Sequence, residues 1–252
     1  MLLDYLPSKQ YVSSTKQPCT IRTARPTTWL VTGANRGIGL EIVKQLLASP
    51  TNLVIAGVRT PEKATALRDL QTAAKGTLHI IKLDVSDFAS VRGSTKDLEA
   101  ILGDTGLDYL INNAGVGPRD TAFTIDPEVL LETFKTNSIG PVLVSQVALP
   151  FLEKGSTKKI AHISSTCGSS ALNMLAYKQK LERPDFTVLT LCPGAVKTDM
   201  SGGYWELEPP ESVAGLLKQK ESSMWFSGDL GHLISAMFVS PVKNYRWAFC
   251  VG

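Results

Sequence analysis

The stretch Thr32-Gly33-Ala34-Asn35-Arg36-Gly37-Ile38-Gly39 follows a short apolar run, Thr28–Thr32, and leads into a segment with helical spacing of apolar residues. We expect Gly33 to permit a tight turn, Gly37 to let a ligand approach the backbone, and Gly39 to allow close packing. The helix that follows offers free N–H groups and the positive end of its dipole. The stretch therefore predicts a phosphate-bearing dinucleotide at the end of the first strand.

Two basic residues near this turn bear on the choice of dinucleotide. Folds that prefer NAD usually carry an acidic residue about 20 residues after the motif, where it binds the ribose 2′-hydroxyl. Arg59 occupies the corresponding position, and Arg36 lies within the turn. Two guanidinium groups without a carboxylate suit a 2′-phosphate, although both could instead be solvated surface residues. We expect NADP as the cofactor, bound also by Asn35 and Ile38.

Short apolar runs alternate with helix-like segments, such as Ile38–Leu47 and Val91–Leu102, along most of the chain. The expected strands are Thr28–Thr32, Leu53–Val58, His79–Leu83, Tyr109–Asn112, Lys159–Ile163 and Phe186–Leu191, with a further candidate at Arg246–Val251. Continuous apolar strands separated by helices indicate a parallel sheet that is covered on both faces. The sequence predicts a single α/β domain with a doubly wound, Rossmann-type parallel sheet.

We divide the chain into three parts by composition. Residues 1–26 are rich in Ser, Thr, Lys and Pro and are expected to form a poorly ordered arm. Residues 27–221 are expected to form the NADP-binding domain. Residues 222–252 form an atypical tail, which contains the candidate last strand.

Composition excludes several classes of function. The 252 residues include 26 basic and 23 acidic side chains, and a formal net charge of +3 does not favour nucleic acid binding. Four widely spaced cysteines without a CxxC pair indicate reduced thiols in a cytoplasmic protein and no metal site. We expect neither a signal peptide nor a membrane span, because no apolar run is long enough.

The spacing of the glycine-rich stretch resembles the short-chain dehydrogenase/reductase family, and further motifs follow in the family's order. Asp84-Val85 ends the third expected strand, where the family holds the adenine ring. Asn112-Asn113-Ala114-Gly115 ends the fourth and matches the family's NNAG motif beside the cofactor. In Pro193-Gly194-Ala195-Val196-Lys197-Thr198, Val196 and Thr198 match the segment that contacts the nicotinamide carboxamide. Singly, Asp84 could cap a helix and Asn113 could be a turn residue, but their joint order favours the family.

The resemblance also implies catalytic roles. Asn137 matches the family's proton-relay asparagine, and Ser165 matches the serine that polarises the substrate carbonyl. In this family a tyrosine donates the proton, and a lysine four residues later lowers the tyrosine pKa. The implied function is NADP-dependent reduction of a carbonyl group on a small apolar molecule, similar to the carbonyl- and keto-reductase branch common in fungal secondary metabolism. The resemblance further implies a homodimer or tetramer.

The tyrosine–lysine pair is missing from its expected context. Only Tyr5 is followed by a lysine four residues later, and it precedes the first strand. Ser170-Ala171-Leu172-Asn173-Met174-Leu175 resembles the family stretch after the lysine, which would place the tyrosine at Ser165, where the serine motif already lies. We infer that about a dozen residues at the start of a helix are absent between Gly168 and Ala171.

Three interpretations follow from this gap. Tyr177, with Lys178 or Lys180 beside it, is the candidate substitute for the missing acid. Alternatively, the protein binds NADPH without efficient turnover, as a scaffold or sensor. A third alternative is a product shortened by splicing or by a missed exon, which would fold poorly because part of a central helix is gone.

Overall fold

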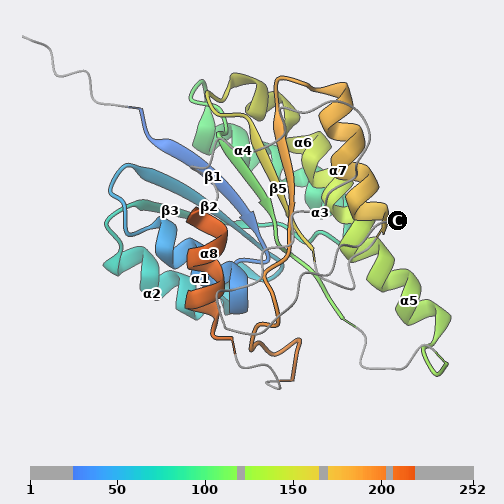
Figure 1. Ribbon diagram of the computed structural model, residues 1–252. Coiled ribbons are helices and arrows are strands. Elements are labelled where there is room, and N and C mark those ends of the chain that lie inside the picture. The colour runs from blue at the N-terminus through green and yellow to red at the C-terminus, as the bar shows by residue number, and fades with distance from the viewer. Residues whose placement is uncertain (1–24, 118–122, 165–169, 203–206, 219–252) are drawn as a thin grey trace, which may run out of the picture.

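The computed structural model describes residues 25–117, 123–164, 170–202 and 207–218. Within them, six strands form one sheet in which all neighbours are parallel. In chain order the strands are β1 (Thr27–Thr32), β2 (Asn52–Val58), β3 (Thr77–Lys82), β4 (Tyr109–Asn112), β5 (Lys159–Ile163) and β6 (Thr187–Leu191). Their order across the sheet, β3-β2-β1-β4-β5-β6, confirms the predicted doubly wound fold (Figure 1).

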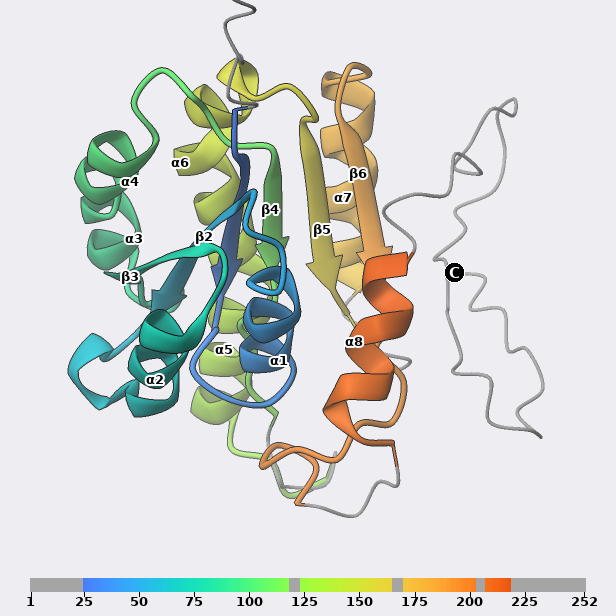
Figure 2. The ribbon, with the colours of Figure 1, turned by 90° about the vertical axis from the view of Figure 1, so that its left-hand side faces the viewer.

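Helices cover both faces of this sheet (Figure 2). One face carries α1 (Gly37–Leu46), α2 (Thr65–Ala73) and α8 (Pro209–Lys218). The other carries α3 (Phe88–Gly93), α4 (Thr95–Leu102), α6 (Gly140–Lys154) and α7 (Ser170–Glu182). A short 3₁₀ turn, η1 (Pro61–Lys63), precedes α2, while α5 (Pro127–Phe134) continues through the π-helix η2 (Lys135–Ile139) into α6 and projects from the body (Figure 1).

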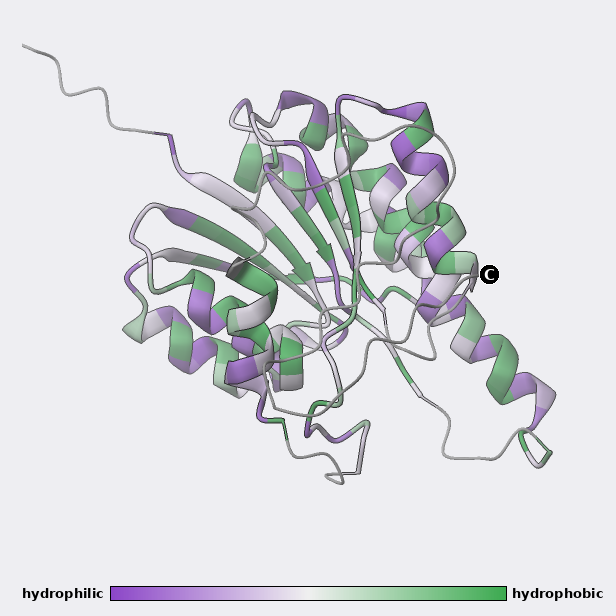
Figure 3. Cartoon of the chain, viewed as in Figure 1, coloured by the Kyte–Doolittle hydropathy of each residue, from purple (hydrophilic) through white to green (hydrophobic). Residues whose placement is uncertain are grey.

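Two apolar cores lie between the sheet and these helices. Successive side chains of a strand point to opposite faces, so neighbouring residues enter different cores. Leu30 and Ile55 pack in the core beneath α3, α4 and α6, whereas Val31 and Val54 pack in the core beneath α1, α2 and α8. In Figure 3 hydrophobic residues recur along the strands, and hydrophobic and hydrophilic residues alternate along the helices. The strands are apolar almost without interruption because each strand is buried on both faces of the sheet.

The strand order reverses at β1 and β4, and this reversal positions the candidate site. From β1 the chain builds outward to β2 and β3, and from β4 it builds in the opposite direction. In folds with such a reversal, ligands bind in the crevice outside the carboxyl ends of the strands. The glycine-rich turn after β1 and Asn113–Gly115 after β4 both lie at these carboxyl ends.

The structure differs from the sequence predictions in several local features. The single helix expected over Val91–Leu102 is two helices, because the buried Ser94 hydroxyl donates to the Val91 carbonyl at 2.7 Å and the chain turns there. β3 ends at Lys82, two residues before Asp84. Arg25, placed in the expected arm, pairs with Asp108. The candidate strand Arg246–Val251 and the whole tail 222–252 lie outside the described residues.

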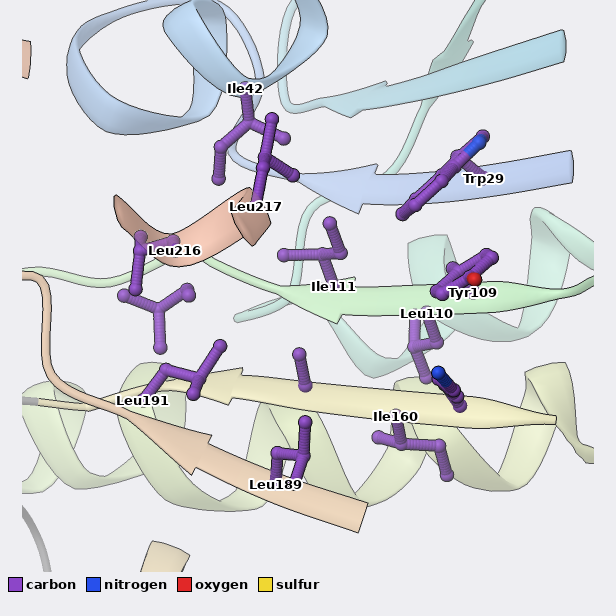
Figure 4. A pocket seen from close by; sticks show the side chains of 13 residues that line it. Trp29, Ile42, Tyr109, Leu110, Ile111, Ile160, Leu189, Leu191, Leu216 and Leu217 are labelled. Atoms are coloured by element: carbon purple, nitrogen blue, oxygen red, sulfur yellow. The ribbon is translucent and has the colours of Figure 1, made fainter. Parts of the chain in front are cut away.

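An apolar pocket lies between α8 and the sheet (Figure 4). The stacked rings of Trp29 and Tyr109, with centroids 3.7 Å apart, border one end, and Leu216 and Leu217 of α8 border the other. Lys159 is the one charged residue among the 13 that line it. Because few polar groups converge there, this pocket lacks the means to orient a substrate. Within the described ranges, no helix combines the length and apolar character needed to cross a membrane.

Candidate active site

The glycine-rich turn between β1 and α1 has the geometry that its spacing predicts. Gly33 and Gly37 have φ angles of +65° and +53°, which side chains rarely permit. A Cβ atom at Gly33 would lie 2.8 Å from the Ala114 Cα, and one at Gly39 would lie 2.3 Å from the Gly33 carbonyl oxygen. At Gly37 the nearest atom is the Thr198 methyl carbon, at 3.4 Å. Gly33 and Gly39 thus permit close packing, whereas Gly37 keeps the start of α1 open.

Hydrogen bonds join this turn to the residues after β4. The buried Thr32 hydroxyl accepts the backbone N–H groups of Asn113 and Ala114 at 3.0 and 3.1 Å. The Asn113 side chain donates to the carbonyl oxygens of Thr32 and Gly33 at 3.0 and 3.3 Å. The Asn113 amide therefore positions the turn. Sequence reasoning did not assign a role to Thr32; the signal was a hydroxyl residue directly before the first glycine.

The start of α1 is electropositive. Its first turn contains no acidic residue, and Arg36 is its N-cap residue. Arg59 is exposed directly after β2, the neighbour of β1 in the sheet. Asn35 is exposed beside Arg36, while Ile38 packs against the core beneath α1. Free N–H groups, two guanidinium groups and an open glycine backbone form a donor set that fits the phosphates of a dinucleotide.

Asp84 and Val85 lie just beyond β3, and the structure holds both in a tight turn. One Asp84 carboxylate oxygen accepts the Ser86 hydroxyl at 2.7 Å and the Ser86 N–H at 3.0 Å. Val85 is buried, and a Cβ atom at Gly140 would lie 2.7 Å from its carbonyl oxygen. The cap of α3 is Asp87, so Asp84 does not cap this helix.

Asn137 lies in the π-helix η2, which enters the site beside β4. Its amide makes two hydrogen bonds to the Val116 backbone, accepting the N–H at 2.9 Å and donating to the carbonyl oxygen at 2.7 Å. A Cβ atom at Gly115 would lie 3.4 Å from the Asn137 side-chain oxygen. Short π-helical segments frequently occur at functional sites because they alter the backbone hydrogen-bond pattern. The structure thus brings Asn137 and the Asn113–Gly115 segment together.

The chain after β6 returns to the glycine-rich turn. Val196 is buried and forms an isolated parallel bridge with Leu207. The Thr198 side chain lies beside Gly37, and the Met200 Cγ would lie 3.4 Å from a Cβ atom at Gly117. This segment therefore approaches both the glycine-rich turn and the chain after β4. The predicted cofactor residues after β1, β4 and β6 meet at the carboxyl ends of the strands.

The catalytic half of the site is less complete. Ser165 lies outside the described residues, and α7 begins at Ser170, with only six residues between it and the end of β5. Leu172, Ala176 and Gln179 of α7 face the body, so Tyr177, which is 46% exposed, lies on its outer side. The catalytic role of Tyr177 stays a prediction.

Neither neighbouring lysine supports Tyr177 as an acid. The Lys180 ammonium group donates to the carbonyl oxygens of Pro184 and Phe186 at 3.0 and 2.9 Å, so it binds the chain just beyond α7. Lys178 is exposed. The structure thus gives the Lys180 ammonium group backbone partners beyond the helix, and the pairing of Tyr177 with Lys178 or Lys180 stays a prediction.

A buried histidine beneath this region was also missed from the sequence. His162 of β5 is fully buried, and burial lowers its pKa to about 4, so the imidazole is neutral at physiological pH. Its Nε2–H donates to the Gln179 side-chain oxygen at 2.9 Å, and its Nδ1 accepts from Asn112 at 3.2 Å. His162 thus fixes α7 against β4 and β5. A histidine inside an apolar strand was the signal.

Known proteins resemble this chain in both sequence and fold. The family model for short chain dehydrogenase matches residues 27–208. An uncharacterized oxidoreductase of Schizosaccharomyces pombe is 32% identical over 190 residues, covering 68% of this chain and 74% of the relative. The short-chain dehydrogenase/reductase iacC of Pestalotiopsis fici is 27% identical over 222 residues, covering 75% and 79%.

A solved structure agrees with these relatives. The NADPH-bound carbonyl reductase from chicken fatty liver superposes with a TM-score of 0.73 and 34% identity, covering 77% of this chain and 86% of that protein. Fold, motifs and relatives define a Rossmann-type oxidoreductase. The chain belongs to the short-chain dehydrogenase family, as its motifs predicted.

Proposed function

We propose that this protein binds NADPH at the carboxyl ends of β1, β2 and β4 and reduces the carbonyl group of a small apolar metabolite. The observation that carries the proposal is the acid-free start of α1, with Arg36 at its N-cap and Arg59 after the neighbouring strand. This arrangement suits a 2′-phosphate. A similar solved reductase is described as NADPH-bound, which supports the proposal. We further propose a cytoplasmic role in secondary metabolism, on the family resemblance.

The residues divide the work of binding along the crevice. Gly37 and the N–H groups of α1 would hold the pyrophosphate, and Asp84 and Val85 would hold the adenine. Val196 and Thr198 would contact the nicotinamide carboxamide. When bound, NADPH supplies the hydride.

The residues of the catalytic half would act on the substrate carbonyl. Ser165 would polarise the carbonyl oxygen by donating a hydrogen bond to it. Asn137 would hold a water molecule of the proton relay, next to the shifted hydrogen bonds of η2, where the Gly140 N–H bonds the Lys135 carbonyl.

A second candidate function rests on the short connection between β5 and α7. In the described part of the chain, neither Tyr109 nor Tyr177 has a lysine four residues later. A missing general acid lowers the rate about 10²- to 10⁴-fold, while cofactor binding can persist. This observation favours an NADPH-binding protein with little turnover as the alternative to an efficient reductase.

One experiment separates these functions. NADPH at 100 times its dissociation constant should raise the unfolding temperature by an amount equivalent to about 2–3 kcal/mol of stability. NADH at the same concentration should raise it less. NADPH oxidation with a generic aryl ketone is expected to be slow but measurable. Stabilisation without turnover would leave only the binding function, and the absence of stabilisation would indicate a defective shortened product.

The Tyr177→Phe variant serves as the internal control in this assay. Because Tyr177 lies on the outer side of α7, we expect the variant to retain full residual turnover. Loss of turnover with unchanged NADPH binding would instead assign Tyr177 as the proton donor.

We also propose self-association through α5 and the outer side of α7. None of the residues of α5 is buried, and Val129, Leu130, Leu131 and Phe134 are between 41% and 57% exposed. A second copy is the partner we expect, since exposed apolar helix faces of this kind mark interfaces. Light scattering should show a dimer or tetramer that Leu131→Glu dissociates. Ala100→Glu, at an exposed position of α4, is the matched control, and a monomeric parent protein would refute the proposal.

A further inference from the structure

The loop after β6 places a carboxylate against the residue that would hold the 2′-phosphate. The Arg36 Nη1 and the Asp199 Oδ2 are 3.2 Å apart, although the two residues are 163 positions apart in the chain. Asp199 follows Thr198, whose side chain lies beside Gly37. The carboxylate therefore lies at the start of α1, where the phosphates of a dinucleotide are expected.

Stability does not account for this ion pair. The Arg36 and Asp199 side chains are 65% and 77% exposed, and pairs this exposed contribute little to the free energy of folding. The effect on an incoming anion is different in kind. Asp199 occupies one donor nitrogen of the guanidinium group and adds negative charge beside a helix start that has no acidic residue of its own.

A 2′-phosphate must compete with this carboxylate, whereas a 2′-hydroxyl does not need the guanidinium charge. Of the two dinucleotides, NADPH carries the additional phosphate and NADH carries the hydroxyl. Breaking the ion pair on binding therefore weakens NADPH binding selectively. Negative charge near the pyrophosphate weakens both dinucleotides alike, so it changes affinity but not preference.

We propose that Asp199 is a specificity-determining residue that limits the preference for NADPH over NADH by competing with the 2′-phosphate for Arg36. The inference rests on the proposed binding of NADPH and adds a residue that neither the motifs nor the family resemblance assigned. Asp199 acts through Arg36 and takes no part in the transfer of hydride or proton.

A double-mutant cycle tests this inference. Dissociation constants for NADPH and NADH are measured by calorimetry at low ionic strength for the parent protein, Asp199→Asn, Arg36→Gln and the double variant. We expect Asp199→Asn to tighten NADPH binding about two- to fivefold and to change NADH binding less. Arg36→Gln should weaken NADPH binding about tenfold or more. In the Arg36→Gln background, Asp199→Asn should no longer change the preference, because its target is gone.

The chain offers a matched control on the same segment. Lys197 and Glu208 form an ion pair of 3.1 Å with side chains 52% and 55% exposed. Glu208→Gln removes the same charge from another exposed ion pair and should leave the NADPH-to-NADH preference unchanged. Thermal unfolding without cofactor verifies that every variant is folded.

Two kinds of result would overturn the inference. In the first, the parent protein binds NADPH, but Asp199→Asn leaves the preference for NADPH over NADH unchanged or lowers it. The same conclusion follows if Asp199→Asn changes this preference equally in the Arg36→Gln background. In these cases only the role of Asp199 fails. If Glu208→Gln changes the preference as much as Asp199→Asn does, the effect comes from the net charge of the protein and the role of Asp199 fails as well. A folded parent protein that binds neither dinucleotide would overturn the proposed function and this inference together.

Discussion

Gly39→Ala is expected to lower the free energy of unfolding by about 3 kcal/mol and to remove the stabilisation by NADPH. A Cβ atom there would lie 2.3 Å from the Gly33 carbonyl oxygen and 2.5 Å from the Asn113 side-chain nitrogen. Neither atom moves cheaply, because one is backbone and the other donates to two carbonyl oxygens. The turn that holds the phosphates must therefore distort. Urea unfolding and thermal shift with NADPH measure the two effects.

Gly93→Ala is the matched control for this substitution. Gly93 is the last residue of α3, and no atom outside its own helix lies within 4 Å of a Cβ atom placed there. Alanine is favoured over glycine in helices, so we expect unchanged stability or a gain of up to about 1 kcal/mol. If the Gly39→Ala variant has the same stability and the same NADPH affinity as the parent protein, then the close packing of Gly39 against Gly33 and Asn113 is contradicted.

Asp108→Asn is expected to cost about 3 kcal/mol at neutral pH, although Asp108 lies at the opposite edge of the sheet from the candidate site. Its carboxylate is buried and accepts the N–H groups of Thr28 and Ser156 at 3.0 and 2.9 Å. Arg25 supplies the neighbouring positive charge. An asparagine would turn an NH₂ group toward buried donors, which then lose their acceptor. Urea unfolding measures the loss.

The pH dependence of this loss has a definite sign. Burial raises the pKa of Asp108, but hydrogen bonds from Thr28 and Ser156 and the charge of Arg25 lower it by more, so that the pKa lies below its ordinary value. A pKa lowered by folding adds stability that is complete above the unfolded value and is lost as the pH falls through the folded value. The difference between the parent protein and Asp108→Asn should be constant from about pH 6 to 8 and shrink below about pH 4.

Asp104→Asn is the control for this prediction. Asp104 is fully exposed, and its carboxylate lies 3.9 Å from the Lys154 ammonium nitrogen. We expect a change in the free energy of unfolding of at most about 0.5 kcal/mol. A similar loss in both variants, or a difference for Asp108→Asn that does not begin to shrink below about pH 4, would contradict the role assigned to the buried carboxylate.

The fold was largely predictable because its signals are local. All six predicted strands within the described residues are present, and their bounds differ by at most two residues. Apolar continuity in strands such as Val54–Val58 reflects burial on both faces, which a short window of sequence displays. The break at Ser94 was missed because it depends on a buried hydroxyl that bonds its own helix.

The sequence predicted where the candidate site lies better than it predicted what each residue does there. Gly33, Gly37 and Gly39 lie as their spacing predicts, since a turn between a strand and a helix is formed within eight residues. Asn113 was assigned to the cofactor, yet its side chain bonds the carbonyl of Gly33, 80 positions earlier. That contact exists only when β1 and β4 are neighbours.

The sequence by itself determined the parallel sheet, the glycine-rich turn and the basic residues beside it, because strand periodicity and glycine spacing act over short distances. Only the tertiary structure decided that Asp199 reaches Arg36 and that Tyr177 lies on the outer side of α7. These features depend on which loops meet at the edge of the sheet and on how a helix is rotated against it. Both are set by packing between distant segments, which no local pattern records.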